Sequence, residues 1–268
     1  MRPVQLVGAE GVRWIPDSPS GTAALVLAGS SGRVDSARAE LLAHHGVLAE
    51  SIRWFGGAGQ NEGPWEIPLE IFLARVDDLA RTCDRVMVVG TSFGAEAALL
   101  TGAHSPHVSA VAAFAPSDVV WAGVRPDGSL TSHWTLDGTP LPYVDLVDDW
   151  EPDTDPPAFL GHYEASRDRF RESLTPAAIP VEHIDQVLLV AGGDDQVWPS
   201  QTMAEAIAAR RDTHGLETAL VLDPEAGHRT VLPGEPLAAG GMRMRRGGTP
   251  AADSRLGAAA WSQLSALL

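Results

Sequence analysis

The sequence predicts an α/β fold with a mostly parallel, doubly wound sheet. Short apolar runs bounded by glycine alternate with small-residue helical patterns along most of the 268 residues. This alternation is typical of βαβ units, in which helices cover both faces of a parallel sheet. Apolar residues make up 44% of the chain and charged residues 20%, which is the balance of a globular protein. We therefore expect a single domain spanning residues 1–268.

The expected elements follow one another in a regular order. After a hairpin formed by 4–7 and 12–15, we expect core strands at 24–29, 47–54, 85–90, 108–114, 186–193 and 217–223. The expected helices cover 34–45, a stretch of about four turns from Pro64, 93–101, 200–211 and 250–268. Gly46 suits the left-handed position that ends a helix, and Ser200 is expected to cap the helix that follows it.

The alternation breaks between residues 117 and 179, where tryptophans, prolines and acidic residues mix without a sustained period. We expect this segment to be a lid-like insertion over the carboxyl edge of the sheet, where α/β enzymes bind substrates. Trp121 and Trp134 are candidates for lining an apolar substrate pocket. The alternative is that these aromatic side chains pack the insertion onto its base.

The charge and cysteine content exclude several classes of partner. The formal net charge is −16, and all 19 basic side chains are arginines. Nucleic acids and anionic membranes are held by basic surfaces, so we expect neither as a partner. No stretch has the pattern of a signal peptide or a membrane span, and Cys83 is the only cysteine. We expect a cytoplasmic protein with no metal and no cofactor, because its histidines lack metal-ligand spacing.

A serine stands in the turn between an apolar strand and a helix, in the stretch VMVVGTSFGAEAALL. A strand that turns this sharply strains the backbone of Ser92, and Gly90 and Gly94 provide the space that the turn requires. The turn exposes the Ser92 hydroxyl and leaves the Phe93 amide at a helix N-terminus, where it can donate to an oxyanion. This is the nucleophile elbow of an α/β-hydrolase; the alternative is a structural serine at a helix start.

A serine nucleophile needs a base and an orienting carboxylate, which this fold supplies in the order serine, acid, histidine. Asp194 and Asp195 follow a late strand, and Asp195 fits the usual spacing after Gly192, although Asp194 is an alternative. His228 follows the last strand and is the candidate base.

The turn Gly29-Ser30-Ser31-Gly32 follows the first core strand. Small residues there allow main-chain N–H groups to face the site. Ser31 is the first candidate for a second oxyanion donor and Gly32 the second; the alternative is a flexible turn before a helix.

Six stretches together carry a family resemblance: GSSG, WFGGAGQNEGPWEIPLEIF, VVGTSFGAEAALL, IPVEHI, AGGDDQVWPS and DPEAGH. The chain resembles the catalytic domain of the acyl-CoA thioesterase and bile-acid-CoA:amino-acid N-acyltransferase family. The resemblance implies a triad of Ser92, Asp195 and His228. Amino-acid-conjugating members tend to use cysteine as the nucleophile, so a serine favours water as the acyl acceptor.

We expect a serine hydrolase that acts on a small-molecule acyl thioester or ester through an acyl-enzyme, with acyl-CoA as one candidate substrate. Arg243, Arg245 and Arg246 form the tightest arginine cluster in the sequence and are candidates for binding the phosphates of coenzyme A. The alternative for these three arginines is a solvated, mobile loop. The alternatives are an acyltransferase, a hydrolase or cyclase acting on a carrier-bound product, and a non-catalytic binding protein. The sequence does not predict the oligomeric state.

Overall fold

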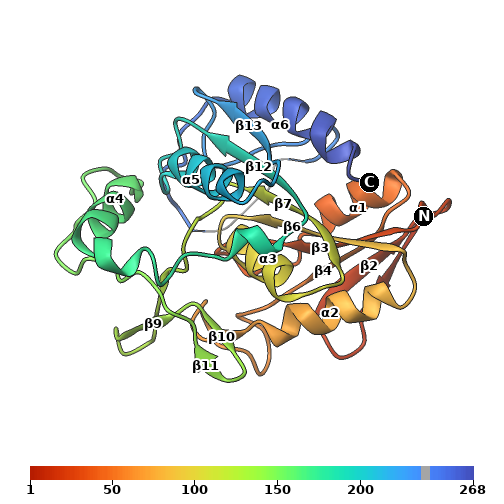
Figure 1. Ribbon diagram of the computed structural model, residues 1–268, viewed down its shortest axis with the longest axis horizontal. Helices are drawn as coiled ribbons and strands as arrows, with labels where there is room; N and C mark the ends of the chain where they lie inside the picture. The colour runs from red at the N-terminus through yellow and green to blue at the C-terminus, as the bar shows by residue number, and fades with distance from the viewer. Residues whose placement is uncertain (237–241) are drawn as a thin grey trace.

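The computed structural model describes residues 1–236 and 242–268, and its centre is an eight-stranded sheet (Figure 1). The strands lie in the order β1-β2-β4-β3-β6-β7-β12-β13, and all neighbouring pairs from β4 to β13 are parallel. At the other end of this sheet, β1 pairs with β2 and β2 pairs with β4 in antiparallel orientation. The strands are β1 Arg2–Gln5, β2 Gly11–Ile15, β3 Thr22–Leu27, β4 Leu48–Ile52, β6 Arg85–Thr91, β7 Val108–Phe114, β12 Gln186–Gly192 and β13 Ala219–Asp223. The predicted mostly parallel sheet is confirmed.

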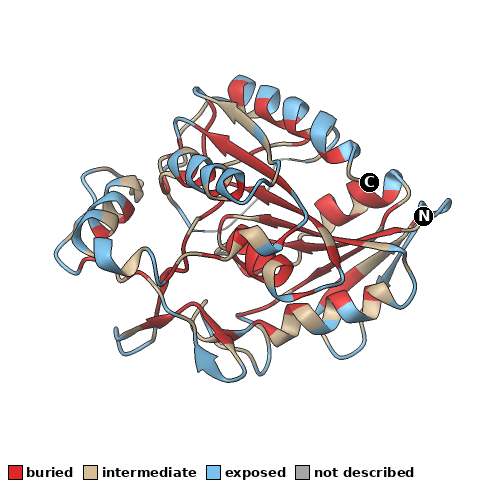
Figure 2. Ribbon diagram, in the orientation of Figure 1, coloured by how far each residue is buried: buried red, intermediate tan, exposed pale blue. Residues whose placement is uncertain are grey.

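Helices cover both faces of this sheet, as the alternating pattern predicts. One apolar cluster joins the sheet to α1 (Ser36–His44) and α6 (Pro250–Ser265). The other joins it to α2 (Glu70–Ala80), α3 (Phe93–His104) and α5 (Ser200–Thr213). Figure 2 shows the buried strands between these layers, with the exposed residues on the outer sides of the helices. The sheet is therefore doubly wound.

Two details differ from the sequence predictions. The helix expected from Pro64 is preceded by a short strand, β5 (Ile67–Pro68), which pairs in parallel with β10 (Trp134–Leu136), so that α2 begins only at Glu70. A partner distant in sequence thus overrides the local helical pattern. Ser200 is also not the cap of α5: it is the first residue of the helix, and its hydroxyl donates to Asp195 at 2.6 Å.

The prediction for Gly46 is confirmed. Its φ is +88°, a conformation that favours glycine, and the backbone N–H groups of Gly46 and Val47 donate to the carbonyls of Ala43 and Leu42. These bonds end α1 and direct the chain into β4.

The segment 117–179 folds into short elements beside the carboxyl end of the sheet (Figure 1). They are β8 Ala122–Val124, β9 Leu130–Ser132, β10, β11 Thr139–Pro140, α4 Leu160–Arg169 and the 3-10 turn Arg171–Ser173; a second 3-10 turn, Val181–His183, leads into β12. β10 pairs with both β5 and β11, whereas β8 pairs with β9. Trp121, Tyr163 and Trp198 belong to an apolar cluster of their own. This cluster ties the segment to the loop after β12.

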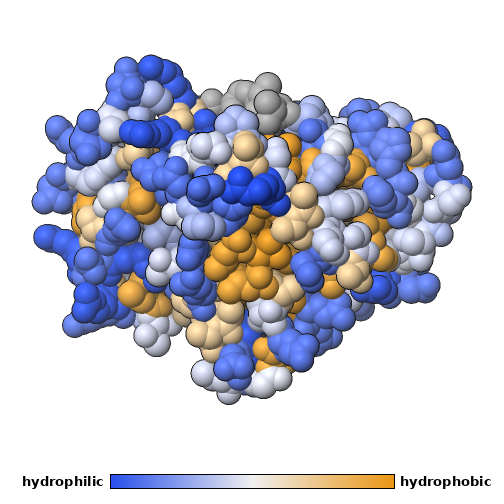
Figure 3. All heavy atoms as spheres, turned by 90° about the horizontal axis from the view of Figure 1, so that it is seen from above, coloured by the Kyte–Doolittle hydropathy of each residue, from blue (hydrophilic) through white to orange (hydrophobic). Residues whose placement is uncertain are grey.

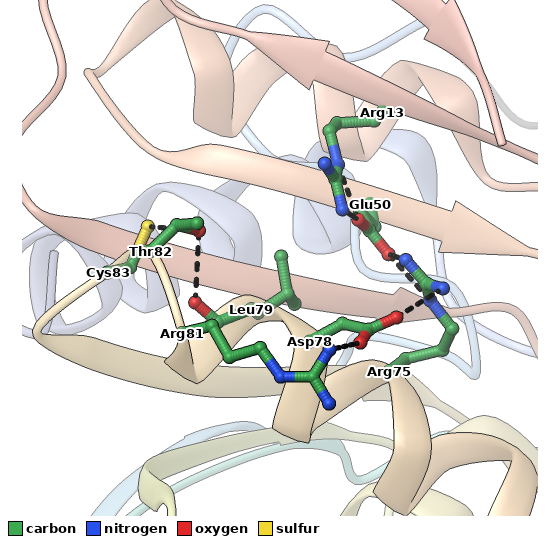
Figure 4. Close-up of polar contacts among 8 residues, drawn as sticks. All are labelled: Arg13, Glu50, Arg75, Asp78, Leu79, Arg81, Thr82 and Cys83. Atoms are coloured by element: carbon green, nitrogen blue, oxygen red, sulfur yellow. Dashed lines mark hydrogen bonds and ion pairs between the residues drawn. The ribbon is translucent and has the colours of Figure 1, made fainter.

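A chain of ion pairs joins β2 and β4 of the sheet to α2 (Figure 4). Glu50 of β4 is fully buried, and one of its carboxylate oxygens pairs with the guanidinium of Arg13 from β2. Arg75 of α2 donates to the other oxygen at 2.7 Å and also to Asp78, which pairs with Arg81. The buried Glu50 carboxylate is therefore compensated by two arginines.

Most large apolar side chains are internal. Five are exposed among the described residues: Val4, Val7, Val124, Leu220 and Met242. The face seen from above has hydrophilic residues around its edge and a group of apolar residues near its middle (Figure 3). No helix in the described part of the chain is long and apolar enough to cross a membrane.

Candidate active site

The turn between β6 and α3 holds Ser92 in a strained conformation, with φ +59° and ψ −126°. Few residues other than glycine adopt this conformation, and such strain is concentrated at functional sites. A Cβ on Gly90 would lie 1.9 Å from the carbonyl oxygen of Gly94, and one on Gly94 would lie 2.4 Å from the carbonyl oxygen of Ala28. Both positions therefore require glycine, and the predicted elbow geometry is present.

Asp195 lies in the loop after β12, is 3% exposed, and contacts the histidine after β13. The Nδ1–H of His228 donates to Asp195 Oδ2 at 2.8 Å, because a carboxylate can only accept. The Ser200 hydroxyl donates to the same oxygen, and the Val197 and Trp198 amides donate to Oδ1 at 2.8 and 3.3 Å. Four donors thus hold this carboxylate in one orientation, which fixes the tautomer and direction of the imidazole.

The neighbouring Asp194 turns away from this histidine. Its side chain accepts bonds from the Gln196 amide and from the Gly248 N–H, both at 2.8 Å, and it is exposed. The structure therefore brings Asp195, and not Asp194, to His228.

Ser92 and His228 line one pocket of about 650 Å³. Its walls are the turn after β3, the start of α1, the segment 228–236, and residues from 242 to the start of α6. Among the described residues, none from 117–179 lines it. The pocket thus combines the predicted nucleophile with the predicted base, and the lid role of the insertion stays a prediction.

The predicted oxyanion donors are placed differently from one another. Ser31 lines the pocket, and Phe93 is the first residue of α3, where amides have no acceptor within the helix. The Gly32 N–H donates to the Gly29 carbonyl at 3.0 Å and so closes the turn. A Cβ on Gly29 would lie 2.9 Å from the Cβ of Ser92, so this turn approaches the elbow closely. The geometry favours Ser31 over Gly32.

The structure does not bring Trp121 or Trp134 to the pocket. Both side chains are fully buried, and neither lines it. The Trp134 indole N–H and the Trp121 backbone N–H donate to Glu96 Oε1 at 2.6 and 3.1 Å. The alternative interpretation, in which these aromatic residues pack the insertion onto its base, matches these contacts.

Of the three clustered arginines, only Arg246 lines the pocket. Arg243 is exposed and its guanidinium pairs with Asp155 at 2.7 Å, and Arg245 is exposed while its amide donates to the Pro157 carbonyl. Adjacency in sequence does not place these three side chains at one site.

Two buried charged residues near the site were not predicted. Arg38 of α1 donates to both oxygens of Glu235, at 2.6 and 3.0 Å, and to the Thr91 hydroxyl and the Thr230 carbonyl. It thus joins the residue before Ser92 to the loop that carries the histidine. Glu96 of α3 is the other. A signal existed for Glu96, because its charge lies in an otherwise apolar helical pattern. The helix of Arg38 also carries Glu40 and His44, so nothing in its local sequence singled out Arg38.

In the described residues, no group of three or more histidine, cysteine, aspartate or glutamate side chains is arranged to hold a metal ion.

The family model described as BAAT / Acyl-CoA thioester hydrolase C terminal matches residues 72–268. The chain belongs to this family. Acyl-coenzyme A thioesterase 1 from Rattus norvegicus is 37% identical over 94 residues, which cover 32% of this chain and 22% of the rat protein. Acyl-coenzyme A thioesterase 2, mitochondrial, from Mus musculus is 36% identical over 94 residues, 32% of this chain and 21% of the mouse protein. The match thus spans about a fifth of these curated relatives.

Solved structures confirm the α/β-hydrolase fold of this family member. A puromycin-hydrolysing peptidase from Mycobacterium tuberculosis has a TM-score of 0.60 at 14% identity, covering 98% of this chain and 38% of that one. A candidate dienelactone hydrolase from Klebsiella pneumoniae has a TM-score of 0.57 at 16% identity, covering 96% and 91%. At such identities the likeness concerns the fold alone.

Proposed function

We propose that this protein hydrolyses small-molecule acyl thioesters, or related acyl esters, with Ser92 as the nucleophile. Three observations support the proposal: the strained elbow, the shared pocket of Ser92 and His228, and the bond between His228 and Asp195. The family and the names of the two curated relatives favour acyl-CoA thioesters as the substrate class.

The reaction proceeds in two halves. Nε2 of His228 takes the proton of the Ser92 hydroxyl, and the serine oxygen attacks the acyl carbonyl. The resulting oxyanion accepts hydrogen bonds from the N–H of Phe93 and from an N–H of the Ser31 turn. His228 returns the proton to the departing thiol or alcohol, which leaves an acyl-enzyme. Water, deprotonated by the same imidazole, then releases the acid and restores Ser92.

Asp195 acts through the histidine in this scheme. The imidazole becomes an imidazolium in each half-reaction, and the adjacent carboxylate stabilises that charge. Asp195 already accepts four hydrogen bonds before the reaction starts, so it needs no reorganisation when the charge develops.

The observation that carries the proposal is the 2.8 Å bond between His228 and Asp195 in the loops beside the Ser92 elbow. The test is a panel of acyl-CoA thioesters and nitrophenyl esters assayed with the wild-type protein and Ser92→Ala. We expect turnover that falls by more than about 10⁴-fold in the variant. A serine-directed phosphonate should label the wild type at Ser92. Wild-type rates in Ser92→Ala would overturn the proposal, and ester turnover without thioester turnover would remove coenzyme A as the leaving group.

A further inference from the structure

Three arginines reach the pocket from separate segments of the chain. Arg33 follows the turn after β3, Arg229 directly follows the histidine of the site, and Arg246 lies just before α6. All three line the pocket that contains Ser92. Each is half-buried, so that each guanidinium is partly withdrawn from solvent. Only the fold brings these three residues together.

The pocket is locally positive in an acidic protein. The chain carries a net charge of −16, yet four arginines line this pocket against three acidic residues, Asp35, Glu235 and Asp253. Glu235 is bound by Arg38, the fourth arginine, through both of its oxygens. The Asp253 carboxylate accepts the Gly227 N–H at 2.8 Å. A local concentration of positive charge in a concave site attracts anions.

The three guanidinium groups are close enough to repel one another. Burial lowers the pKa of Arg229, and the charges of Arg246 and Arg33 lower it further. Burial also lowers the pKa of Arg246, with a further contribution from Arg33. A bound anion would offset this repulsion, because an opposite charge stabilises each guanidinium.

The backbone holds Arg246 beside the histidine. The His228 N–H donates to the Arg246 carbonyl at 2.8 Å. The Arg246 guanidinium donates to the carbonyls of Met244 and Met242 at 3.2 and 2.8 Å. These two bonds use two of its five N–H donors. Arg246 is thus positioned relative to the reacting groups and retains donors for a ligand.

We propose that Arg33, Arg229 and Arg246 bind an anionic group of the substrate, a phosphate or a carboxylate, while the acyl carbonyl lies at Ser92. This site rests on the acyl hydrolase function proposed above and deepens it, because it selects charged substrates. Guanidinium groups bind phosphate and carboxylate through paired N–H donors. Two sources can supply the anion: the phosphates of a leaving thiol such as coenzyme A, or a carboxylate at the far end of the acyl chain.

The kinetic test compares four substrates. They are hexanoyl-CoA, hexanoyl-N-acetylcysteamine, the N-acetylcysteamine thioester of adipic acid, and nitrophenyl hexanoate. Arg33→Gln, Arg229→Gln and Arg246→Gln are each expected to lower kcat/KM by about 10-fold to 100-fold for the anionic substrates that use the site. They should change kcat/KM by less than about 3-fold for the two uncharged substrates. The matched control is Arg81→Gln, which removes an exposed arginine at the end of α2 and should leave all four values within about 2-fold.

The pattern of loss identifies the source. A loss confined to hexanoyl-CoA assigns the site to phosphate, and a loss confined to the adipic thioester assigns it to an acyl carboxylate. Equal losses for charged and uncharged substrates, or no loss in any of them, would overturn the proposal.

A binding measurement separates this site from the hydrolase function. Calorimetry on Ser92→Ala with inorganic pyrophosphate and with adipate requires no turnover. We expect at least one of these anions to bind, and Ser92→Ala/Arg246→Gln to bind it about 10-fold more weakly or worse. If the wild type hydrolyses none of the four substrates but this binding is observed, the hydrolase proposal fails and the anion site stands. If Ser92→Ala binds neither anion, the anion site is overturned.

Discussion

Two buried carboxylates near the nucleophile elbow each lie beside a histidine, and their surroundings differ. Asp195 accepts four hydrogen bonds and its histidine lines the pocket. Glu96 accepts two bonds on one oxygen, and its other oxygen and the Nδ1 of His133 have no hydrogen-bond partner in the described part of the chain. The separation between Glu96 Oε1 and His133 Nδ1 is 3.5 Å.

The ring of Phe93 packs near His133 and near Trp198, and Trp198 in turn packs near His228. The centroid of the Phe93 ring lies 4.3 Å from that of His133 and 5.5 Å from that of Trp198, and the Trp198 ring lies 6.0 Å from the His228 ring. A carboxylate beside a histidine thus occurs twice in the surroundings of Phe93. What separates them is access to the pocket and the number of donors around the carboxylate. We infer that Asp195 serves chemistry, whereas Glu96 ties α3 to the insertion.

The largest expected effect concerns the first pair. Asp195→Asn should lower kcat/KM for a thioester by about 10⁴-fold, because an amide does not fix the imidazole tautomer or stabilise its positive charge. The adjacent Asp194→Asn is the matched control, since Asp194 contacts Gln196 and Gly248 instead. It should stay within about 5-fold of the wild type. Similar losses in both variants would contradict the role of Asp195 as the carboxylate that orients His228.

The loop that carries His228 also holds Glu235, whose side chain is 8% exposed and pairs with Arg38. Arg38→Met should lower the free energy of unfolding by about 3–5 kcal/mol, because it leaves the largely buried Glu235 carboxylate without its arginine and with only the Leu232 N–H as a donor. The double variant Arg38→Met/Glu235→Leu should recover most of that loss. Urea unfolding of both variants is the measurement. A double variant as unstable as the single one would mean that Arg38 acts through its bonds to Thr91 and Thr230 instead.

The pair of Glu96 and His133 can be tested at Trp134, whose indole N–H donates to Glu96. Trp134→Phe removes the indole N–H that donates a hydrogen bond to Glu96 Oε1. The Trp121 backbone N–H is then the remaining donor to this buried oxygen. We expect the free energy of unfolding to fall by about 1–3 kcal/mol. Relative kcat/KM values for short and long acyl chains should keep the same order, because Trp134 is fully buried. A changed chain-length preference would instead place Trp134 at the substrate.

The features predicted from sequence are those that local patterns determine. A strand, a tight turn and a helix around Ser92, and a loop after the last strand at His228, are readable because neighbouring residues dictate them. The parallel sheet follows from the alternation of strands and helices, and the structure confirms it. The choice between Asp194 and Asp195 required side-chain directions, which sequence spacing favours but does not determine.

Contacts between segments that are distant in sequence could not be predicted from the sequence pattern. Glu96 contacts Trp121 and Trp134 because the insertion folds back on α3. The sequence does not show this contact, and the two tryptophans were therefore predicted to line the pocket. Arg246 resembled a partner of Arg243 and Arg245, whereas the fold places it in one pocket with Arg33 and Arg229. In both cases the pairing follows from the topology of the sheet and its loops.

A carboxylate at the surface gives the smallest expected effect and completes the comparison. Glu182 accepts two bonds from Arg210, each at 2.7 Å, and this hydrogen bonding is the main cause that lowers the pKa of Glu182. Both side chains are partly exposed, at 16% and 36%, so solvent screens the pair. Glu182→Gln should lower the free energy of unfolding by about 0.2–1 kcal/mol at neutral pH. Because the folded-state pKa is depressed, the contribution is complete above the ordinary glutamate pKa of 4.5 and is lost as pH falls through the lower folded value. Urea unfolding from pH 7 to pH 3 should therefore show the two proteins converging in acid, and a difference that grows on acidification would contradict the assignment.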